Sequence, residues 1–260
     1  MSFVVTVYVP EGVVMAADSR QSATIERKTP EGERLPPIQT VTSDFTYKLF
    51  LLKPPRVGIS AYGDTLLGGV QMESHIRRLE EERLKDNDTV DKVADKMMAY
   101  FRGKFPQANT VFHVAGFKKE AGVSVPHVYV CYIGKEKMER VNFDPKANKV
   151  KYGCSWGGET DTILLILKPY QVLGPENKPI AAPSFPILWD SMNLQDAIDF
   201  AVYAVRTTID TIRFQARPKS VGGEIDVLLL SPEEAKWVQR KQLHGEKGFY
   251  KILPPLEGGR

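Results

Sequence analysis

Ser2, which directly follows Met1, is the residue with the clearest potential for chemistry. A serine hydroxyl is a weak nucleophile and needs a base beside it. If Met1 is removed, a routine processing step before a small residue, Ser2 carries such a base as its own α-amine. An α-amine titrates near about 8, so a useful fraction of it is neutral at cellular pH. Ser2 is therefore a candidate N-terminal nucleophile, and the alternative is that it is an ordinary second residue.

The histidines and cysteines do not form a second candidate site. The four histidines lie on different predicted elements, so neither a metal site nor a Ser-His-Asp triad is indicated: His75, His113, His127 and His244. Cys131 and Cys154 are far apart and match no disulfide framework or metal-ligand spacing. Cys154 lacks a basic neighbour in sequence, which favours a buried small hydrophobe over a nucleophile. We expect no metal and no cofactor.

Short strands and three helices must position Ser2. Runs of β-branched and aromatic residues between turn signals predict strands at 2–9, 12–18, 47–52, 57–62, 110–116, 127–133, 138–143, 150–158 and 225–230. Apolar spacing predicts helices from Thr65 to about Lys85, from Asp88 or Thr89 to before Pro106, and from Asn193 to about Gln215. Segments 21–42 and 168–190 contain three and five prolines and are expected to be long loops.

The third helix has the clearest boundaries. Asn193 is a favourable N-cap, and Asp196 three residues later can help to satisfy the first-turn amides. Blocks of strands and blocks of helices, rather than a strict alternation of single elements, favour a layered α+β architecture. We expect one domain over residues 1–260 with inserted loops near 21–42 and 168–190.

Composition excludes several classes of protein. Hydrophobic residues make up 42% and charged residues 26% of the 260 residues, as in ordinary globular proteins. The net charge of +3 is too small to indicate a nucleic-acid partner. Apolar runs such as 163–167 are too short to span a membrane, and the N-terminus does not have the pattern of a signal peptide. A cytoplasmic location is therefore the expectation.

Several segments in order resemble the β-type subunits of the proteasome. Segment 12–20, Gly-Val-Val-Met-Ala-Ala-Asp-Ser-Arg, is similar to the second strand of that family. The other similar segments are 47–50 (Tyr-Lys-Leu-Phe), 59–64 (Ile-Ser-Ala-Tyr-Gly-Asp), 153–158 (Gly-Cys-Ser-Trp-Gly-Gly) and 220–227 (Ser-Val-Gly-Gly-Glu-Ile-Asp-Val). The resemblance implies a four-layer αββα sandwich of the N-terminal-nucleophile (Ntn) hydrolases, with helices outside two packed antiparallel sheets.

The resemblance also implies roles for individual residues. Asp18 matches the strand carboxylate of the family, and counting back sixteen residues reaches Ser2 at the place of the nucleophile. Lys48 would lie beside Ser2, lower the pKa of its amine and pair with Asp18. For this pair the alternative is a purely structural salt bridge.

Further residues would support the nucleophile by the same resemblance. The backbone near Tyr62 and Gly63 would form the oxyanion hole, and the bulky Tyr62 would narrow the entrance. Ser155 would hydrogen-bond the Ser2 amine, and Ser220 would help to support it. The acidic residue that the family has a few positions before Ser220 is missing, since residues 217–219 are Arg-Pro-Lys.

The activity that the resemblance implies is cleavage of peptide or amide bonds through an acyl-enzyme on Ser2. It further implies a peptide or protein substrate and a homo-oligomer, ring-shaped or helical, with an ATPase unfoldase as an optional partner. Two alternatives stay open. One is a non-catalytic structural subunit of such an assembly, and the other is a small-molecule amidase of the Ntn class.

Overall fold

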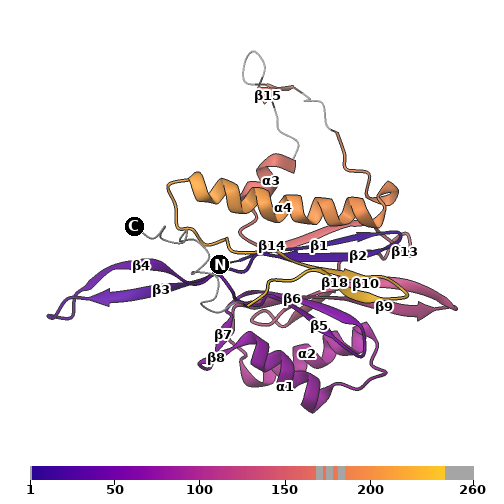
Figure 1. Ribbon diagram of the computed structural model, residues 1–260, viewed down its shortest axis with the longest axis horizontal. Coiled ribbons are helices and arrows are strands. Elements are labelled where there is room, and N and C mark those ends of the chain that lie inside the picture. The colour runs from indigo at the N-terminus through magenta and orange to yellow at the C-terminus, as the bar shows by residue number, and fades with distance from the viewer. Residues whose placement is uncertain (1, 168–171, 174–177, 181–184, 244–260) are drawn as a thin grey trace, which may run out of the picture.

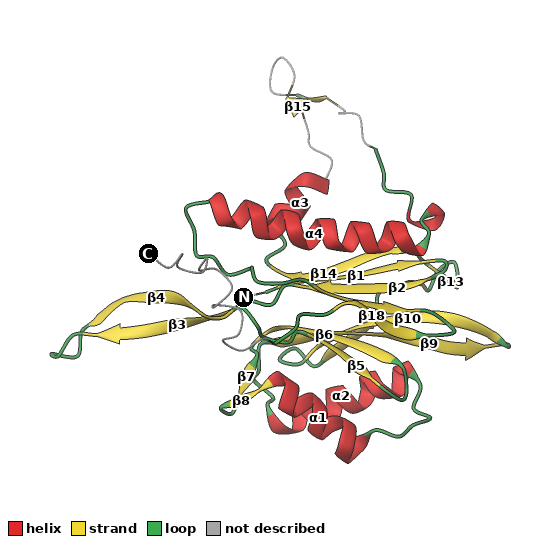
Figure 2. Cartoon of the chain, in the orientation of Figure 1, coloured by secondary structure: helices red, strands yellow, loops and turns green. Residues whose placement is uncertain are grey.

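Two stacked antiparallel sheets form the centre of the molecule (Figures 1 and 2). The computed structural model describes residues 2–167, 172–173, 178–180 and 185–243. Sheet I has the order β14 (Gly153–Gly158), β1 (Phe3–Val9), β2 (Gly12–Ala17), β17 (Asp226–Leu230) and β18 (Ala235–Gln239). Sheet II has the order β11 (Lys137–Arg140), β10 (Val123–Tyr132), β9 (Thr110–Glu120), β6 (Val57–Gly63) and β5 (Leu49–Leu52).

Helices cover the outer face of each sheet. α4 (Leu194–Phe214) and α3 (Asp161–Leu167) lie over sheet I, and α1 (Met72–Arg83) and α2 (Val90–Lys104) lie over sheet II (Figure 2). The predicted four-layer αββα sandwich is therefore confirmed. The smaller elements are β12 (Phe143–Asp144), β13 (Lys149–Val150), β15 (Val172–Leu173), β16 (Pro179–Ile180) and the 3-10 turn Trp189–Ser191.

The side chains of β1 point alternately to its two faces and so contribute to two of the three buried cores. Val5 and Val7 pack with α4, whereas Val4 and Tyr8 pack in the core between the sheets. Every residue of β1 is buried, because a strand at the centre of a sandwich is covered on both faces. Thr6, which also faces sheet II, is the one polar residue of this strand. The third core lies between sheet II and α1 and α2.

α4 begins where the sequence predicts. The Asn193 side chain accepts a hydrogen bond from the backbone N–H of Asp196 at 2.9 Å, and the Asp196 side chain accepts one from the Asn193 N–H at 3.2 Å. This capping box satisfies amides that the first turn of a helix leaves unpaired. The small side chains of Ala197, Ala201 and Ala204 are fully buried and let the helix approach sheet I closely.

The predicted loop at 21–42 is wrong, because this segment forms a hairpin of β3 (Gln21–Lys28) and β4 (Arg34–Ser43) that projects from the body (Figure 1). Pro36 and Pro37 are compatible with it for two reasons. Both strands of a two-stranded ribbon are edge strands, and the pairing register shifts between Ile25 and Arg27, opposite the prolines. We call this hairpin the arm.

The start of the first helix also differs from expectation. The first helix starts at Met72 rather than Thr65, because Gly68 and Gly69 adopt φ of 56° and 76° and turn β7 (Leu66–Leu67) back onto β8 (Val70–Gln71). The predicted loop at 168–190 lies largely outside the described residues. α3, β15, β16 and β18 were not predicted.

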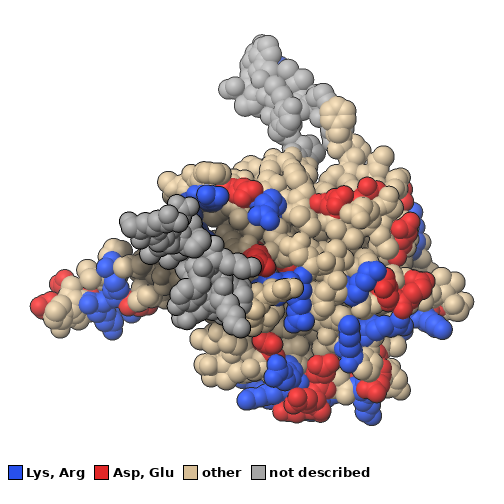
Figure 3. Space-filling model, in the orientation of Figure 1, with Lys and Arg blue, Asp and Glu red and all other residues tan. Residues whose placement is uncertain are grey.

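The surface carries charges of both signs. On the face shown in Figure 3, acidic and basic side chains are interspersed over the α1–α2 layer. The described part of the chain has no helix whose length and apolar character would let it cross a membrane.

Candidate functional site

Ser2 lies at the start of β1, where it lines a cavity of about 460 Å³. The side chain is almost fully buried, with 2% of its surface exposed. The other walls come from the root of the arm, including residues 21–24, and from the turn at 63–66 that follows β6. The candidate nucleophile therefore faces a space that is large enough for a side chain or a small ligand.

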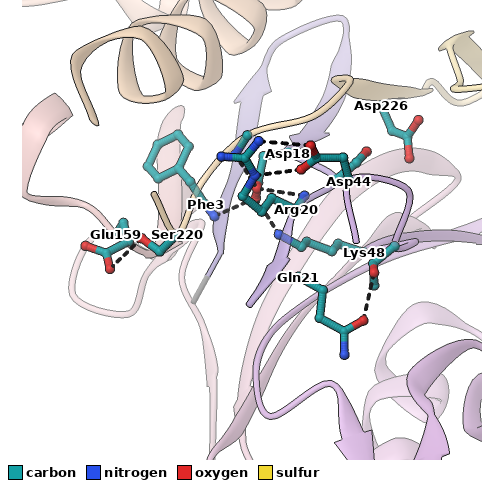
Figure 4. A network of polar contacts seen from close by, with 12 residues as sticks. Phe3, Asp18, Arg20, Gln21, Asp44, Lys48, Glu159, Ser220 and Asp226 are labelled. Carbon is teal, nitrogen blue, oxygen red and sulfur yellow. Dashed lines mark hydrogen bonds and ion pairs between the residues drawn. The ribbon is translucent and has the colours of Figure 1, made fainter. Parts of the chain in front are cut away.

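Asp18, directly after β2, is the centre of a buried polar network (Figure 4). One carboxylate oxygen, Oδ1, accepts hydrogen bonds from the Phe3 N–H at 2.9 Å and from Lys48 Nζ at 2.6 Å. The other, Oδ2, accepts from the backbone N–H groups of Arg20 and Gly222 at 3.1 and 3.0 Å. The predicted Asp18–Lys48 ion pair is present, and four donors compensate the burial of the carboxylate.

Lys48 is fully buried, and its pKa is below the ordinary value for a lysine. Burial is the largest cause, because a desolvated ammonium is disfavoured. The charge of Asp18 and its hydrogen bond oppose this shift, while Lys241 and Arg20 add to it. Asp18 Oδ1 binds both Lys48 Nζ and the N–H that follows Ser2, so the ammonium lies next to the Ser2–Phe3 peptide bond.

Arg20 and Asp44 form the outer wall of this network. Arg20 Nε and Nη2 donate to the two oxygens of Asp44 at 2.6 and 2.9 Å, which is a bidentate pair. Gly222 packs against this guanidinium so closely that an added Cβ would lie 2.6 Å from Arg20 Cζ. The glycines of segment 220–223 therefore allow the turn to approach both Asp18 and Arg20.

Glu159, which sequence reasoning missed, links Ser2 to Ser220: its backbone contacts Ser2 and its carboxylate contacts Ser220. Its N–H donates to the Ser2 carbonyl at 2.8 Å, and its Oε1 accepts from Ser220 Oγ at 3.1 Å. The acidic partner that is missing before Ser220 in the sequence thus comes from a different element, directly after β14. Arg217 Nη1 lies 3.7 Å from the other Glu159 oxygen. The only sequence signal was the position of Glu159 at the end of the glycine-rich segment.

Ser155 does not take its predicted place at the Ser2 amine. β14 runs antiparallel to β1 with Gly158 opposite Phe3, so Ser155 lies opposite Thr6. Its Oγ is 3.5 Å from His113 Nε2, and Thr6 Oγ1 is 2.9 Å from His113 Nδ1. Burial lowers the pKa of His113 to about 4, so the ring is neutral at neutral pH. Ser155 is part of a polar cluster between the sheets.

Gly63 lines the cavity together with Ser2, which an oxyanion hole at this position requires. That its backbone N–H donates to an oxyanion stays a prediction. Only glycine fits at this position, for two reasons. Its φ is 91°, and an added Cβ would lie 1.9 Å from the Asn109 carbonyl oxygen. The Tyr62 ring instead packs over Gly157, where an added Cβ would lie 2.2 Å from it. The ring is half-buried among residues between the sheets, which does not support the expectation that it narrows the entrance.

A second buried ion pair lies beside the first and was also missed. Asp226, the first residue of β17, stands opposite Ala17, which directly precedes Asp18. Lys241 Nζ pairs with Asp226 Oδ2, and both side chains are almost completely buried. Lys241 also lies 4.3 Å from the ring centroid of Tyr47.

The described histidines and Cys154 make local structural contacts or are buried. His75 Nε2 lies 3.0 Å from the Leu67 carbonyl oxygen and His127 Nε2 lies 2.7 Å from Glu120, whereas His244 is outside the described residues. Burial raises the pKa of the Cys154 thiol to about 12, which disfavours the nucleophilic thiolate. No group of His, Cys, Asp or Glu within the described ranges could hold a metal ion.

Comparison with known proteins places the fold. No family model and no curated protein matches the chain. The chain is similar to the solved structure of Anbu from Hyphomicrobium sp. strain MC1, at 15% identity and a TM-score of 0.57 over 96% of this chain and 90% of that one. A Gly-1 mutant of Anbu from the same strain matches over the same shares of both chains, at 15% identity and a TM-score of 0.56.

Anbu from Yersinia bercovieri, described as an ancestral beta-subunit, matches at 15% identity and a TM-score of 0.53 over 91% of this chain and 86% of that one. Identity at this level is evidence for the fold and not for activity. Together with the observed layers, these neighbours assign to this chain the αββα fold of the proteasome-like Ntn hydrolases.

Proposed function

We propose that this protein is an Ntn hydrolase that cleaves peptide or amide bonds through an acyl-enzyme on Ser2. The observation that carries the proposal is the shared contact at Asp18. This carboxylate binds Lys48 and the backbone N–H next to Ser2, and Ser2 itself lines a cavity. Such an arrangement holds a cation where a serine alkoxide would form, which is how a buried charge lowers the barrier to nucleophilic attack.

The reaction has two stages. The Ser2 α-amine takes the hydroxyl proton as Oγ attacks the substrate carbonyl, and backbone N–H groups near Tyr62 and Gly63 donate to the oxyanion. The C–N bond then breaks, the leaving amine takes the proton from the α-ammonium, and the substrate acyl group is left as an ester on Ser2. In the second stage the α-amine takes a proton from water, whose oxygen attacks the ester carbonyl. The acyl C–Oγ bond then breaks, the α-ammonium returns the proton to Ser2 Oγ, and the carboxylic acid product leaves.

We also propose that the protein works as a homo-oligomer, in a ring or a helical arrangement. The support is the description of a structural neighbour as a beta-subunit. A non-catalytic structural subunit is the competing function. It would be favoured by a mature protein that retains Met1, because the Ser2 nitrogen would then be an amide and could not act as a base.

The test is covalent labelling with a peptide epoxyketone, which needs both a hydroxyl and a free α-amine. We expect intact-mass analysis of protein from its own host to show a chain that begins at Ser2 and gains one inhibitor. Ser2→Ala should abolish labelling and hydrolysis, whereas Ser2→Thr should keep part of both. Lys48→Ala should abolish hydrolysis in protein that remains folded by circular dichroism. Wild-type turnover by Ser2→Ala would show that the nucleophile lies elsewhere.

A further inference from the structure

We propose that the cavity beside Ser2 selects substrates with a positively charged side chain next to the scissile bond, and that Asp64 recognises this charge. The inference rests on the proposed function, because it assigns a substrate class to the same site. It depends on three observations: the fixed position of Asp64, the charges of the cavity walls, and the size of the cavity.

Asp64 is held rigidly at the mouth of the cavity. It directly follows Gly63 at the end of β6, and it lines the same cavity as Ser2. Its Oδ2 accepts a hydrogen bond from the Asn109 N–H at 2.8 Å, and its own N–H donates to the Asn109 carbonyl at 3.0 Å. The Thr110 hydroxyl donates to the Asp64 carbonyl at 2.8 Å. A carboxylate fixed in this way loses little conformational entropy when it binds a cation.

The charge of Asp64 is not neutralised within the described structure. No lysine, arginine or histidine among the described residues lies within ion-pairing distance of its carboxylate. Arg20, the one basic side chain among the described residues that line the cavity, is already engaged by Asp44 through two hydrogen bonds. That contact holds the pKa of Asp44 below its ordinary value, so the Arg20–Asp44 pair stays ionised and neutral overall. Asp64 is therefore the one carboxylate among the described residues of the cavity wall, and no cationic side chain pairs with it.

The remaining walls suit a long cationic side chain. They are mostly small or polar and uncharged, and include Thr24, Gln39 and Thr65. These residues offer hydroxyl and amide oxygens to an ammonium or guanidinium group, and the volume of about 460 Å³ admits an extended lysine or arginine side chain. An acidic substrate side chain would be repelled by Asp64, and Arg20 is already paired with Asp44, so the cavity selects against acidic substrates.

The experiment compares fluorogenic peptides that differ only in the residue before the scissile bond: arginine, lysine, citrulline, leucine or glutamate. Citrulline has nearly the shape of arginine without the charge. We expect kcat/KM for arginine to exceed that for citrulline by at least about tenfold, as for a hydrogen bond to a charged group. Asp64→Asn keeps an oxygen for the Asn109 N–H and should remove this preference, whereas Asp64→Lys should favour glutamate.

The matched control is Asp86→Asn, in the exposed turn between α1 and α2, which should leave the preference unchanged. Labelling of Ser2 by arginine and citrulline epoxyketones gives a second readout that does not depend on turnover. Equal rates for arginine and citrulline, or an unchanged preference in Asp64→Asn, would overturn the assignment of Asp64 while leaving the hydrolase intact. Absence of both labelling and hydrolysis with every peptide would instead refute the proposed function and this inference with it.

Discussion

At the scale of single residues, the arrangement around Ser2 uses groups from four separate segments. Asp18 and Lys48 form the pair that the sequence predicts. Glu159 and Ser220 form a contact that it does not, and Glu159 is bound to the Ser2 carbonyl through its backbone. We expect Glu159 to act as a positioning residue, whose negative charge favours the protonated form of the nearby α-amine.

Glu159→Gln tests this role. Glutamine can still accept a hydrogen bond from Ser220, but it has no charge, so the pKa of the Ser2 α-amine should fall. Because the amine must be neutral to act as a base, the acidic limb of the pH profile of kcat/KM should move to lower pH. Asp161→Asn is the control, since Asp161 also pairs with Arg217 and does not contact Ser220. An unmoved acidic limb in Glu159→Gln would contradict the proposed electrostatic role.

At the scale of elements, the start of β17 and the segment after β18 hold the second buried pair. Asp226 accepts hydrogen bonds from both the backbone N–H and the side chain of Lys241. Removal of one partner leaves a buried charge without compensation, and such changes cost about 3–5 kcal/mol. The positive charge of Lys241 also lies near Lys48 and helps to lower the pKa of Lys48.

We therefore expect Lys241→Met to lower the free energy of unfolding by about 3 kcal/mol or more, as measured by urea denaturation. The double variant Asp226→Asn, Lys241→Met removes both charges and should recover part of that loss. Lys236→Met, which removes a half-exposed lysine on β18, is the control and should have little effect. Equal stability of Lys241→Met and the parent would show that the buried pair contributes nothing.

At the scale of the whole molecule, the contact between the two sheets contains a histidine, His113, whose burial makes the stability of the fold depend on pH. His113 is fully buried beside Thr6, and its pKa is about 4 in the folded protein against 6.5 for the ordinary side chain. Between these values the unfolded chain binds a proton that the folded chain does not. Stability should therefore fall as pH decreases from about 6.5 to about 4, by about 3 kcal/mol.

His113→Gln isolates this contribution, because glutamine can still hydrogen-bond Thr6 and does not titrate. The variant should lose less stability than the parent between pH 7 and pH 4, as measured by urea unfolding at each pH. His75→Gln is the control, since His75 lies on α1, outside the contact between the two sheets, and contacts the Leu67 carbonyl. Parallel pH curves for His113→Gln and the parent would rule out His113 as the source.

Much of the layered fold could be predicted from local sequence patterns. β1, β2, β6, β9 and β17 are short apolar runs between turn signals, and α4 has both its N-cap and its small-residue stripe in the sequence. The spacing between Ser2 and Asp18 was also informative, because two strands joined by a tight turn lie side by side. These features depend on residues close in sequence, where period and turn chemistry set the geometry.

Only the tertiary structure decided the rest of the site. The register of β14 on β1 moves Ser155 away from Ser2 and brings Glu159 next to it, and no local pattern specifies that register. The arm could not be predicted, because its prolines are compatible with both a loop and a two-stranded ribbon. Asp226 and Lys241 meet across a strand pair, and Asp64 becomes part of the cavity only when the arm folds beside it. Contacts of this kind depend on the packing of distant segments, whose relative positions are determined by the buried cores that they share.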